Sequence, residues 1–158
     1  MRNKAKQLTY GAAIAALYVT LSHLQNLLLP GSASAMIQVR VSEALSVLAF
    51  FTPAAIPGLS IGCFLFNLTS GAALPLDMLI GTAATALAAG SMYGLRKWPA
   101  VGFLLPAVFN GLLVGWELSV YIGGGFWLNC AYVAAGEIIA LLLGVPLYFA
   151  MKKSIGKM

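Results

Sequence analysis

The sequence is poor in charged residues, in cysteine and in histidine. Charged side chains make up 8% of the 158 residues, against about 25% in typical soluble domains, and only four are acidic. Two cysteines and one histidine are too few for a disulfide-stapled secreted domain or a cluster of metal ligands. The sequence has no glycine-rich phosphate loop before a lysine and no assignable Ser–His–acid triad. We therefore expect no catalytic residue, no metal and no cofactor, and hence no enzyme.

Apolar residues make up most of the sequence. They make up 61% of the chain, and the 17 glycines and seven prolines lie mostly inside apolar stretches. This composition is typical of a polytopic membrane protein, in which each helix needs about 20 mainly apolar residues. We predict an all-α membrane protein, a six-transmembrane-helix bundle with one domain over residues 1–158. Its predicted spans are 8–29, 40–52, 53–70, 75–95, 99–121 and 126–151.

Basic residues predict the orientation of these spans. The net charge is +5, and eight of the nine basic residues flank the six predicted spans on one side. Cytoplasmic loops carry such an excess of Lys and Arg, so both termini are expected in the cytoplasm. The same distribution argues against nucleic acid as a partner. The eight residues are Arg2, Lys4, Lys6, Arg96, Lys97, Lys152, Lys153 and Lys157, and Arg40 is the exception.

The second predicted span is short for a membrane helix. Spans two and three therefore also fit a re-entrant hairpin that enters from outside. Both interpretations give an even number of crossings, so both place the two termini on the same side.

The polar residues of the spans predict a binding pocket that opens to the outside. Ionisable groups inside a membrane cost about 2.5–3.5 kcal/mol each on insertion scales, so each is a candidate functional residue. Glu137 lies in the middle of the sixth span, about 16 Å from its outer end. The other acids and the amides lie in the outer half or at mid-span. They are Glu43, Asp77, Glu117, Asn67, Asn110 and Asn129.

Several of these residues also have a structural interpretation. Arg40 and Glu43 are three residues apart, so they can form an ion pair on a helix. Asp77 follows Pro75 in the first turn of a span, where a carboxylate stabilises a helix N-terminus. Trp127 fits either an interfacial aromatic belt or a wall that stacks on a flat ligand. Glu137 has no basic neighbour in sequence, so we expect it to bind a ligand or carry a proton.

The first span carries small residues at helical spacing. Gly11 and Ala15 form one such pair, and Ala12 and Ala16 form another. Small residues four apart let two helices approach closely in a membrane. They predict either packing inside this protein or docking to another subunit.

The sequence resembles the QueT family of S components of energy-coupling factor (ECF) transporters. The most specific run is Gln-Val-Arg-Val-Ser-Glu-Ala-Leu at residues 38–45, which continues through residues 46–63. Two further matches lie in the last spans. They are Asn110-Gly111 with Glu117-Leu118, and Phe126-Trp127-Leu128-Asn129 with Gly136-Glu137.

The resemblance implies a membrane subunit that binds queuosine precursors, which are 7-deazaguanines that include an aminomethyl form. It implies a multi-pass protein in the lipid bilayer of a bacterial plasma membrane. Its implied protein partners are a transmembrane coupling subunit and two cytoplasmic ATPases. In this scheme the S component takes substrate outside, docks through the first span, and topples in the membrane to release it.

The residue types suit such a ligand. We expect Glu137 to accept hydrogen bonds from the base edge, and Glu117 or Asp77 to bind an ammonium group. Two alternatives remain at this point. One is an S component for another vitamin-like or cationic ligand, and the other is a stand-alone proton-coupled carrier with Glu137 as its proton site. Residues 30–38 are a candidate flexible lid.

Overall fold

The computed structural model describes residues 2–30, 32, 37–71 and 73–155. This part of the chain forms six α-helices and one 3₁₀ helix, and it contains no strand, which confirms the all-α prediction. In chain order the elements are α1 (Arg2–Leu28), η1 (Val41–Phe50), α2 (Ala55–Thr69), α3 (Asp77–Gly94), α4 (Pro99–Gly102), α5 (Leu105–Tyr121) and α6 (Phe126–Ile155).

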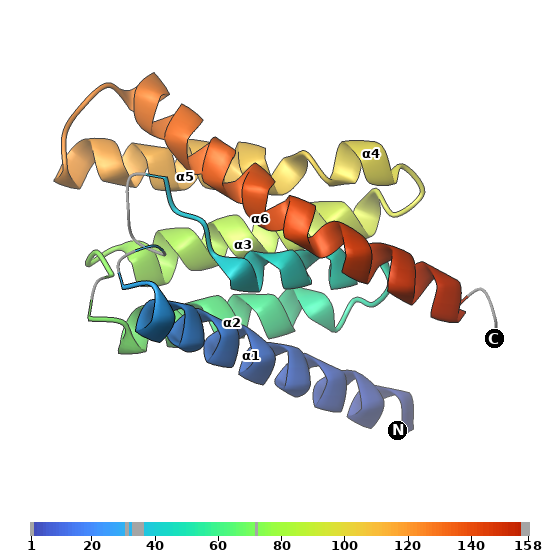
Figure 1. Cartoon of the computed structure of the whole chain (residues 1–158). Helices are drawn as coiled ribbons and strands as arrows, with labels where there is room; N and C mark the ends of the chain where they lie inside the picture. Colours follow the sequence, from blue (N-terminus) through green and yellow to red (C-terminus); the bar gives the residue numbers. More distant parts are fainter. Residues whose placement is uncertain (1, 31, 33–36, 72, 156–158) are drawn as a thin grey trace.

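Successive helices run in opposite directions along one bundle axis, except that α4 and α5 follow each other in the same direction (Figure 1). The start of α1, the connection from α3 to α4 and the end of α6 lie at the same end, which we call the basic end. These segments carry the basic residues that flank the predicted spans. The opposite end, which we call the far end, holds the α1–η1, α2–α3 and α5–α6 connections. The grouping agrees with an even number of crossings, and the side of the membrane stays a prediction.

Two segments are long and apolar enough to cross a membrane. They are Pro99–Tyr121, with 23 residues, and Phe126–Ser154, with 29 residues. The helices Val41–Phe50 and Ala55–Thr69 are apolar but shorter. The number of membrane crossings therefore stays a prediction. The all-helical bundle is confirmed for the described residues.

The second and fifth predicted spans differ from regular membrane helices. The segment expected at 40–52 is a ten-residue 3₁₀ helix, η1, whose length is about 20 Å at the usual rise. The hydrocarbon core is about 30 Å thick, so η1 is too short to cross it alone. The segment expected at 99–121 is divided into α4 and α5, and Pro106 stands in the first turn of α5. Proline fits a helix start because it has no N–H group to leave unpaired.

η1 lies at the centre of the bundle and contacts α1, α2, α3 and α6. Glycines of α6 allow this close approach. A Cβ at Gly144 would lie 2.7 Å from the carbonyl oxygen of Ala44, and one at Gly136 would overlap the backbone of Gln38. The segment from Gln38 to Ala44 therefore rests directly on the backbone of α6.

Aromatic rings fill the bundle between η1 and its basic end. The Phe50 ring lies 5.2 Å from that of Phe103 and 5.5 Å from that of Tyr148. Phe51 also contacts Tyr148, at 5.3 Å between centroids. We call these four residues the aromatic cluster. They join the end of η1, the α4–α5 junction and the second half of α6 in one apolar core.

Candidate functional site

A small polar cavity lies between the start of η1 and the helices α5 and α6. Its volume is about 20 Å³, which is the space of about one water molecule. Four of the residues predicted from the sequence line it together. They are Arg40, Glu43, Asn110 and Glu137. The remaining lining residues are Gln38, Val114 and Val133.

Glu137 presents an open acceptor to this cavity. Its side chain is 5% exposed, and its Oε1 atom has no hydrogen-bond partner among the described residues. It lies near the middle of α6, one residue after the glycine on which Gln38 rests. A buried carboxylate oxygen without a donor is costly, so this atom is the strongest candidate to receive a ligand N–H or a proton.

Asn110 lies on the α5 wall of the same cavity. Its Nδ2 group donates to the carbonyl oxygen of Pro106 at 3.1 Å, one turn earlier in the helix. This bond uses one amide hydrogen, and an amide side chain has a second hydrogen and a carbonyl oxygen besides. Asn110 can therefore both donate to and accept from a bound group.

Glu43 is held by its own protein contacts. Its Oε1 atom accepts a hydrogen bond from the Tyr18 hydroxyl, and its Oε2 atom accepts one from Ser46 Oγ at 3.1 Å. Both carboxylate oxygens therefore have protein donors. Glu43 is therefore held in place as one wall of the cavity, whereas Glu137 is the acceptor with an unused oxygen.

Gln38 is a cavity residue that sequence reasoning missed. The backbone is extended at Arg40, so residues two apart in this segment lie on the same side. Arg40 Nη2 donates to Gln38 Oε1 at 3.5 Å, in agreement with this spacing. The polar alternation of Gln38 and Arg40 around Val39 is the signal that could have identified Gln38.

The Arg40 guanidinium joins the cavity to a second group of polar residues. Arg40 Nη1 donates to Asn67 Oδ1 at 3.4 Å, and the guanidinium carbon lies 5.7 Å from the centre of the Phe66 ring. Arg40 also interacts electrostatically with Glu43 and Asp77. The electrostatic interaction of Arg40 with Glu43 is therefore one part of a larger polar network, and their ion pair stays a prediction.

Asn67 and Asp77 link α2 to the start of α3. Asn67 Nδ2 donates to the backbone carbonyl of Asp77 at 2.8 Å. Asp77 is the first residue of α3, and its carboxylate accepts the backbone N–H of Leu74, in the connection before the helix, at 2.6 Å. Both side chains are buried, and neither lines the cavity.

Glu117 is fully buried beside Asp77. Its exposure is 0%, and neither carboxylate oxygen has a hydrogen-bond donor in the described ranges. Its carboxyl group interacts with that of Asp77 and, electrostatically, with Arg40. Glu117 therefore lies in the same polar network as the cavity but outside its lining.

All four acids of the chain interact with one guanidinium. Arg40 interacts electrostatically with Glu43 and Asp77, and also with Glu117 and Glu137. The other basic residues in the described part of the chain belong to segments at the basic end. This network therefore holds an excess of acidic groups, which protons or a cationic ligand would offset.

Two predicted site residues lie apart from the cavity. Asn129 donates to Ser119 Oγ and to the Gly123 carbonyl, both at 3.0 Å. It thus closes the α5–α6 turn, where Gly123 has a φ of 84°. Trp127 is 75% exposed on the outside of α6. The cavity lining contains no aromatic ring, so a stacking wall is not formed among these residues.

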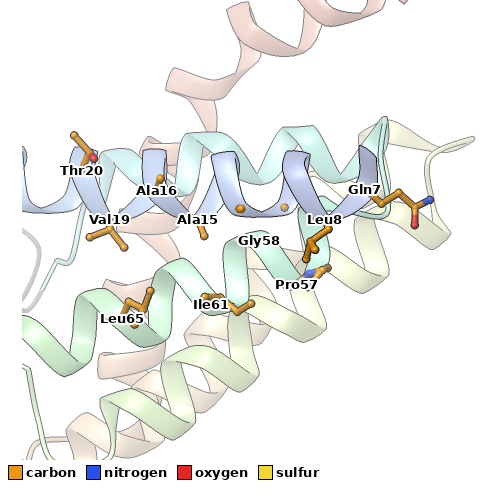
Figure 2. Close-up of a pocket in the computed structure, with 12 residues that line it drawn as sticks. Gln7, Leu8, Ala15, Ala16, Val19, Thr20, Pro57, Gly58, Ile61 and Leu65 are labelled. Carbon is orange, nitrogen blue, oxygen red and sulfur yellow. The ribbon is translucent and has the colours of Figure 1, made fainter. Parts of the chain in front are cut away.

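The small residues of α1 divide between two faces. Gly11 and Ala15 are buried against α2, where a Cβ at Gly58 would lie 2.7 Å from the Gly11 carbonyl. Ala12 and Ala16 are exposed. All four line an apolar groove of about 590 Å³ between α1 and α2. Figure 2 shows Ala15 and Val19 on the lower side of α1, facing Ile61 and Leu65 of α2.

Part of the candidate lid cannot be described. Residues 31 and 33–36 lie outside the described residues, whereas Gln38, the last residue of that segment, lines the cavity.

Among the residues that the structure describes, no group of three or more His, Cys, Asp or Glu residues could hold a metal ion.

Comparison with known families agrees with the resemblance carried by the site residues. A family model described as "QueT transporter" matches residues 8–153, nearly the whole chain. No curated protein and no solved structure gives a significant match. The matched range includes every residue of the cavity and of the α1–α2 groove except Gln7. The chain therefore belongs to the QueT transporter family, a family of membrane transport proteins.

Proposed function

We propose that this chain is the substrate-binding S component of an ECF importer, and that it captures a 7-deazaguanine queuosine precursor from outside the cell. The observation that carries the proposal is the cavity in which Arg40, Glu43, Asn110 and Glu137 converge. One of its acceptors, Glu137 Oε1, has no donor among the described residues.

The donors and acceptors of a 7-deazaguanine suit these side chains. Its amino group and ring N–H lie side by side, so one carboxylate can accept both. We assign this role to Glu137. The neighbouring ring carbonyl would accept a hydrogen bond from the amide of Asn110 or Gln38. An aminomethyl substituent carries a positive charge, which the excess of acids around Arg40 would offset, with Glu117 or Asp77 nearest to the ammonium group.

The cavity must enlarge to accept such a ligand. Pockets for drug-sized ligands measure about 300–1,000 Å³, whereas this cavity measures about 20 Å³. The walls from η1, α5 and α6 therefore have to separate on binding.

The aromatic cluster supports a mechanism in which the ligand leaves the cavity by the route through which it entered. Phe50, Phe103 and Tyr148 are packed together between η1 and the basic end. A path through the bundle would have to separate these rings. Toppling of the whole subunit on its coupling partner delivers the ligand without opening the bundle, and this is the mechanism that we propose.

The α1–α2 groove is the proposed docking surface. Its lining is apolar and contains Gly11, Ala12, Ala15 and Ala16, which leave room for a helix of the coupling subunit. Helices in lipid associate largely through such close van der Waals packing. Two cytoplasmic ATPases would supply the energy through that subunit.

The unpartnered oxygen of Glu137 also suits a proton site, so a stand-alone proton-coupled carrier is the second candidate. Uptake into vesicles that contain this chain alone separates the two candidates. Uptake that follows a pH gradient without any partner would support the carrier. Uptake that requires the coupling subunit, the ATPases and ATP would support the importer.

The substrate is tested by calorimetric titration of the folded, detergent-solubilised protein. The ligands are 7-aminomethyl-7-deazaguanine, its 7-cyano analogue and guanine. The proposal predicts saturable binding of a deazaguanine and much weaker binding of guanine. Absence of binding by all three ligands would reject the substrate and leave an S component for another small ligand.

A further inference from the structure

One face of α1 is joined to η1 by a row of buried polar side chains. Tyr18, Ser22 and Gln25 stand at the helical spacing of four and three residues. The Ser22 and Ser42 Oγ atoms are hydrogen bonded at 2.7 Å. Gln25 Oε1 accepts the backbone N–H of Val41 at 2.7 Å, and Gln25 Nε2 donates to the Val39 carbonyl. A shift of α1 would therefore move the start of η1 with it.

Tyr18 differs from the other two residues because its partner lines the cavity. Its hydroxyl group donates to Glu43 Oε1, and its exposure is 0%. On the side of α2, a Cβ at Gly62 would lie 2.7 Å from Tyr18 Cβ. Tyr18 thus contacts α2 through its first side-chain carbon and the cavity wall through its last atom.

The α1–α2 groove is formed by these same two helices. Gly58, one turn before Gly62, lines the groove, and a Cβ at Gly58 would meet the Gly11 carbonyl of α1 at 2.7 Å. An occupant of the groove that changes the separation of α1 and α2 would displace Tyr18 as well. The displacement would reach Glu43 through the hydroxyl group.

We propose that Tyr18 is a positioning residue that couples the α1–α2 groove to the cavity through its hydrogen bond with Glu43. Because energetic coupling between two sites is reciprocal, ligand in the cavity would change docking at the groove by the same factor. The physiological meaning of this coupling rests on the proposed function, in which the groove docks a partner and the cavity binds substrate.

A mutant cycle tests the coupling without ligand or partner. Gly58→Ala perturbs the groove, and Val114→Cys reports on the cavity through its rate of modification by a small methanethiosulfonate reagent. Mass spectrometry counts modification at position 114 only, because Cys63 and Cys130 are also present. The cycle is run in the wild-type, Tyr18→Phe and Ser22→Ala backgrounds, with folding checked by gel filtration and thermal unfolding.

With Tyr18 present, we expect Gly58→Ala to change the modification rate by about fivefold or more, the lower end of typical coupling between sites. The same effect should persist in Ser22→Ala, which removes an α1–η1 hydrogen bond that does not reach the cavity. It should fall below about twofold in Tyr18→Phe. Gly90→Ala is the control for the glycine change, since a Cβ there has nothing within 4 Å.

An equal effect of Gly58→Ala with and without the Tyr18 hydroxyl would overturn the proposal, as would no effect in any background. If Tyr18→Phe does not fold, Glu43→Ala removes the same bond from the other side and takes its place. The cycle uses no deazaguanine, so rejection of that substrate in the titration would leave its result unchanged.

Discussion

Gln38 rests with its backbone on Gly136 of α6, the residue that precedes Glu137. This contact sets the separation between the start of η1 and the helix that carries the open carboxylate. Gln38 and Glu137 line the same cavity, so the contact also limits its width. A glycine is required because a Cβ at this position would overlap the Gln38 backbone.

Gly136→Ala should push Gln38 away from α6 and destabilise the protein. Overpacking of this kind costs about 1–3 kcal/mol of folding stability. The free energy of unfolding in mixed micelles measures the change, with Gly90→Ala as the matched glycine control, since a Cβ there has nothing within 4 Å. Equal free energies of unfolding in the two variants would show that the Gln38–Gly136 contact does not constrain the packing of η1 on α6.

Asn67→Ala should destabilise the protein through the α2–α3 junction. It removes the hydrogen bond to the Asp77 carbonyl at 2.8 Å and the acceptor of the Arg40 guanidinium. Loss of partners for buried polar groups costs about 1–3 kcal/mol. The free energy of unfolding in mixed micelles measures it. Asn26→Ala is the control, since Asn26 Oδ1 has no hydrogen-bond partner in the described structure, and a similar loss in both variants would contradict the assignment.

Glu117→Gln tests whether Glu117 binds the ammonium group of the ligand and not its ring. If Glu117 offsets that charge, affinity for the aminomethyl compound falls by about tenfold or more, because hydrogen bonds to charged groups contribute about 1.5–3 kcal/mol. Affinity for the 7-cyano compound, which has no positive charge, should stay nearly unchanged. Parallel titrations of both compounds give the ratio, and an equal loss for both would reject this role of Glu117.

Ligand binding should leave tryptophan fluorescence almost unchanged. The three tryptophans, Trp98, Trp116 and Trp127, are 69%, 50% and 75% exposed, and none lines the cavity. Trp127→Leu should therefore bind ligand like the wild-type protein. A large fluorescence change that disappears in Trp127→Leu would instead place the ring of the ligand near Trp127. It would support the prediction that Trp127 stacks on the ligand.

The sequence was sufficient for the helices whose ends carry clear signals. The predicted spans 75–95 and 126–151 correspond to α3 and α6 within a few residues, because proline, glycine and charged residues mark their ends. The 3₁₀ form of η1 could not be predicted, since hydropathy does not distinguish a 3₁₀ helix from an α-helix. The break between α4 and α5 could not be predicted either, because residues 99–105 on both sides of it are apolar. Whether each helix crosses the membrane remains a prediction.

Site residues could be predicted where burial of a polar side chain in an apolar helix costs free energy. They could not be predicted where the side chain has a hydrogen-bond partner in a nearby turn. Glu137 and Asn110 were selected because they lie in the middle of apolar helices, and both line the cavity. Asn129 was predicted because it lies at the outer start of the sixth span, but it closes a turn through Ser119 and Gly123. Such a local contact depends on the backbone path of the turn, which the residue pattern alone does not specify.

We propose that Glu137 holds a 7-deazaguanine in the cavity between η1, α5 and α6. The affinity of Glu137→Gln for 7-aminomethyl-7-deazaguanine tests this role most directly, measured by calorimetry on protein shown to be folded. Ser60→Ala is the control, because it removes only a hydrogen bond within α2. We predict that Glu137→Gln loses about tenfold to a hundredfold in affinity while Ser60→Ala binds like the wild type. Unchanged affinity in Glu137→Gln would show that Glu137 does not hold the ligand.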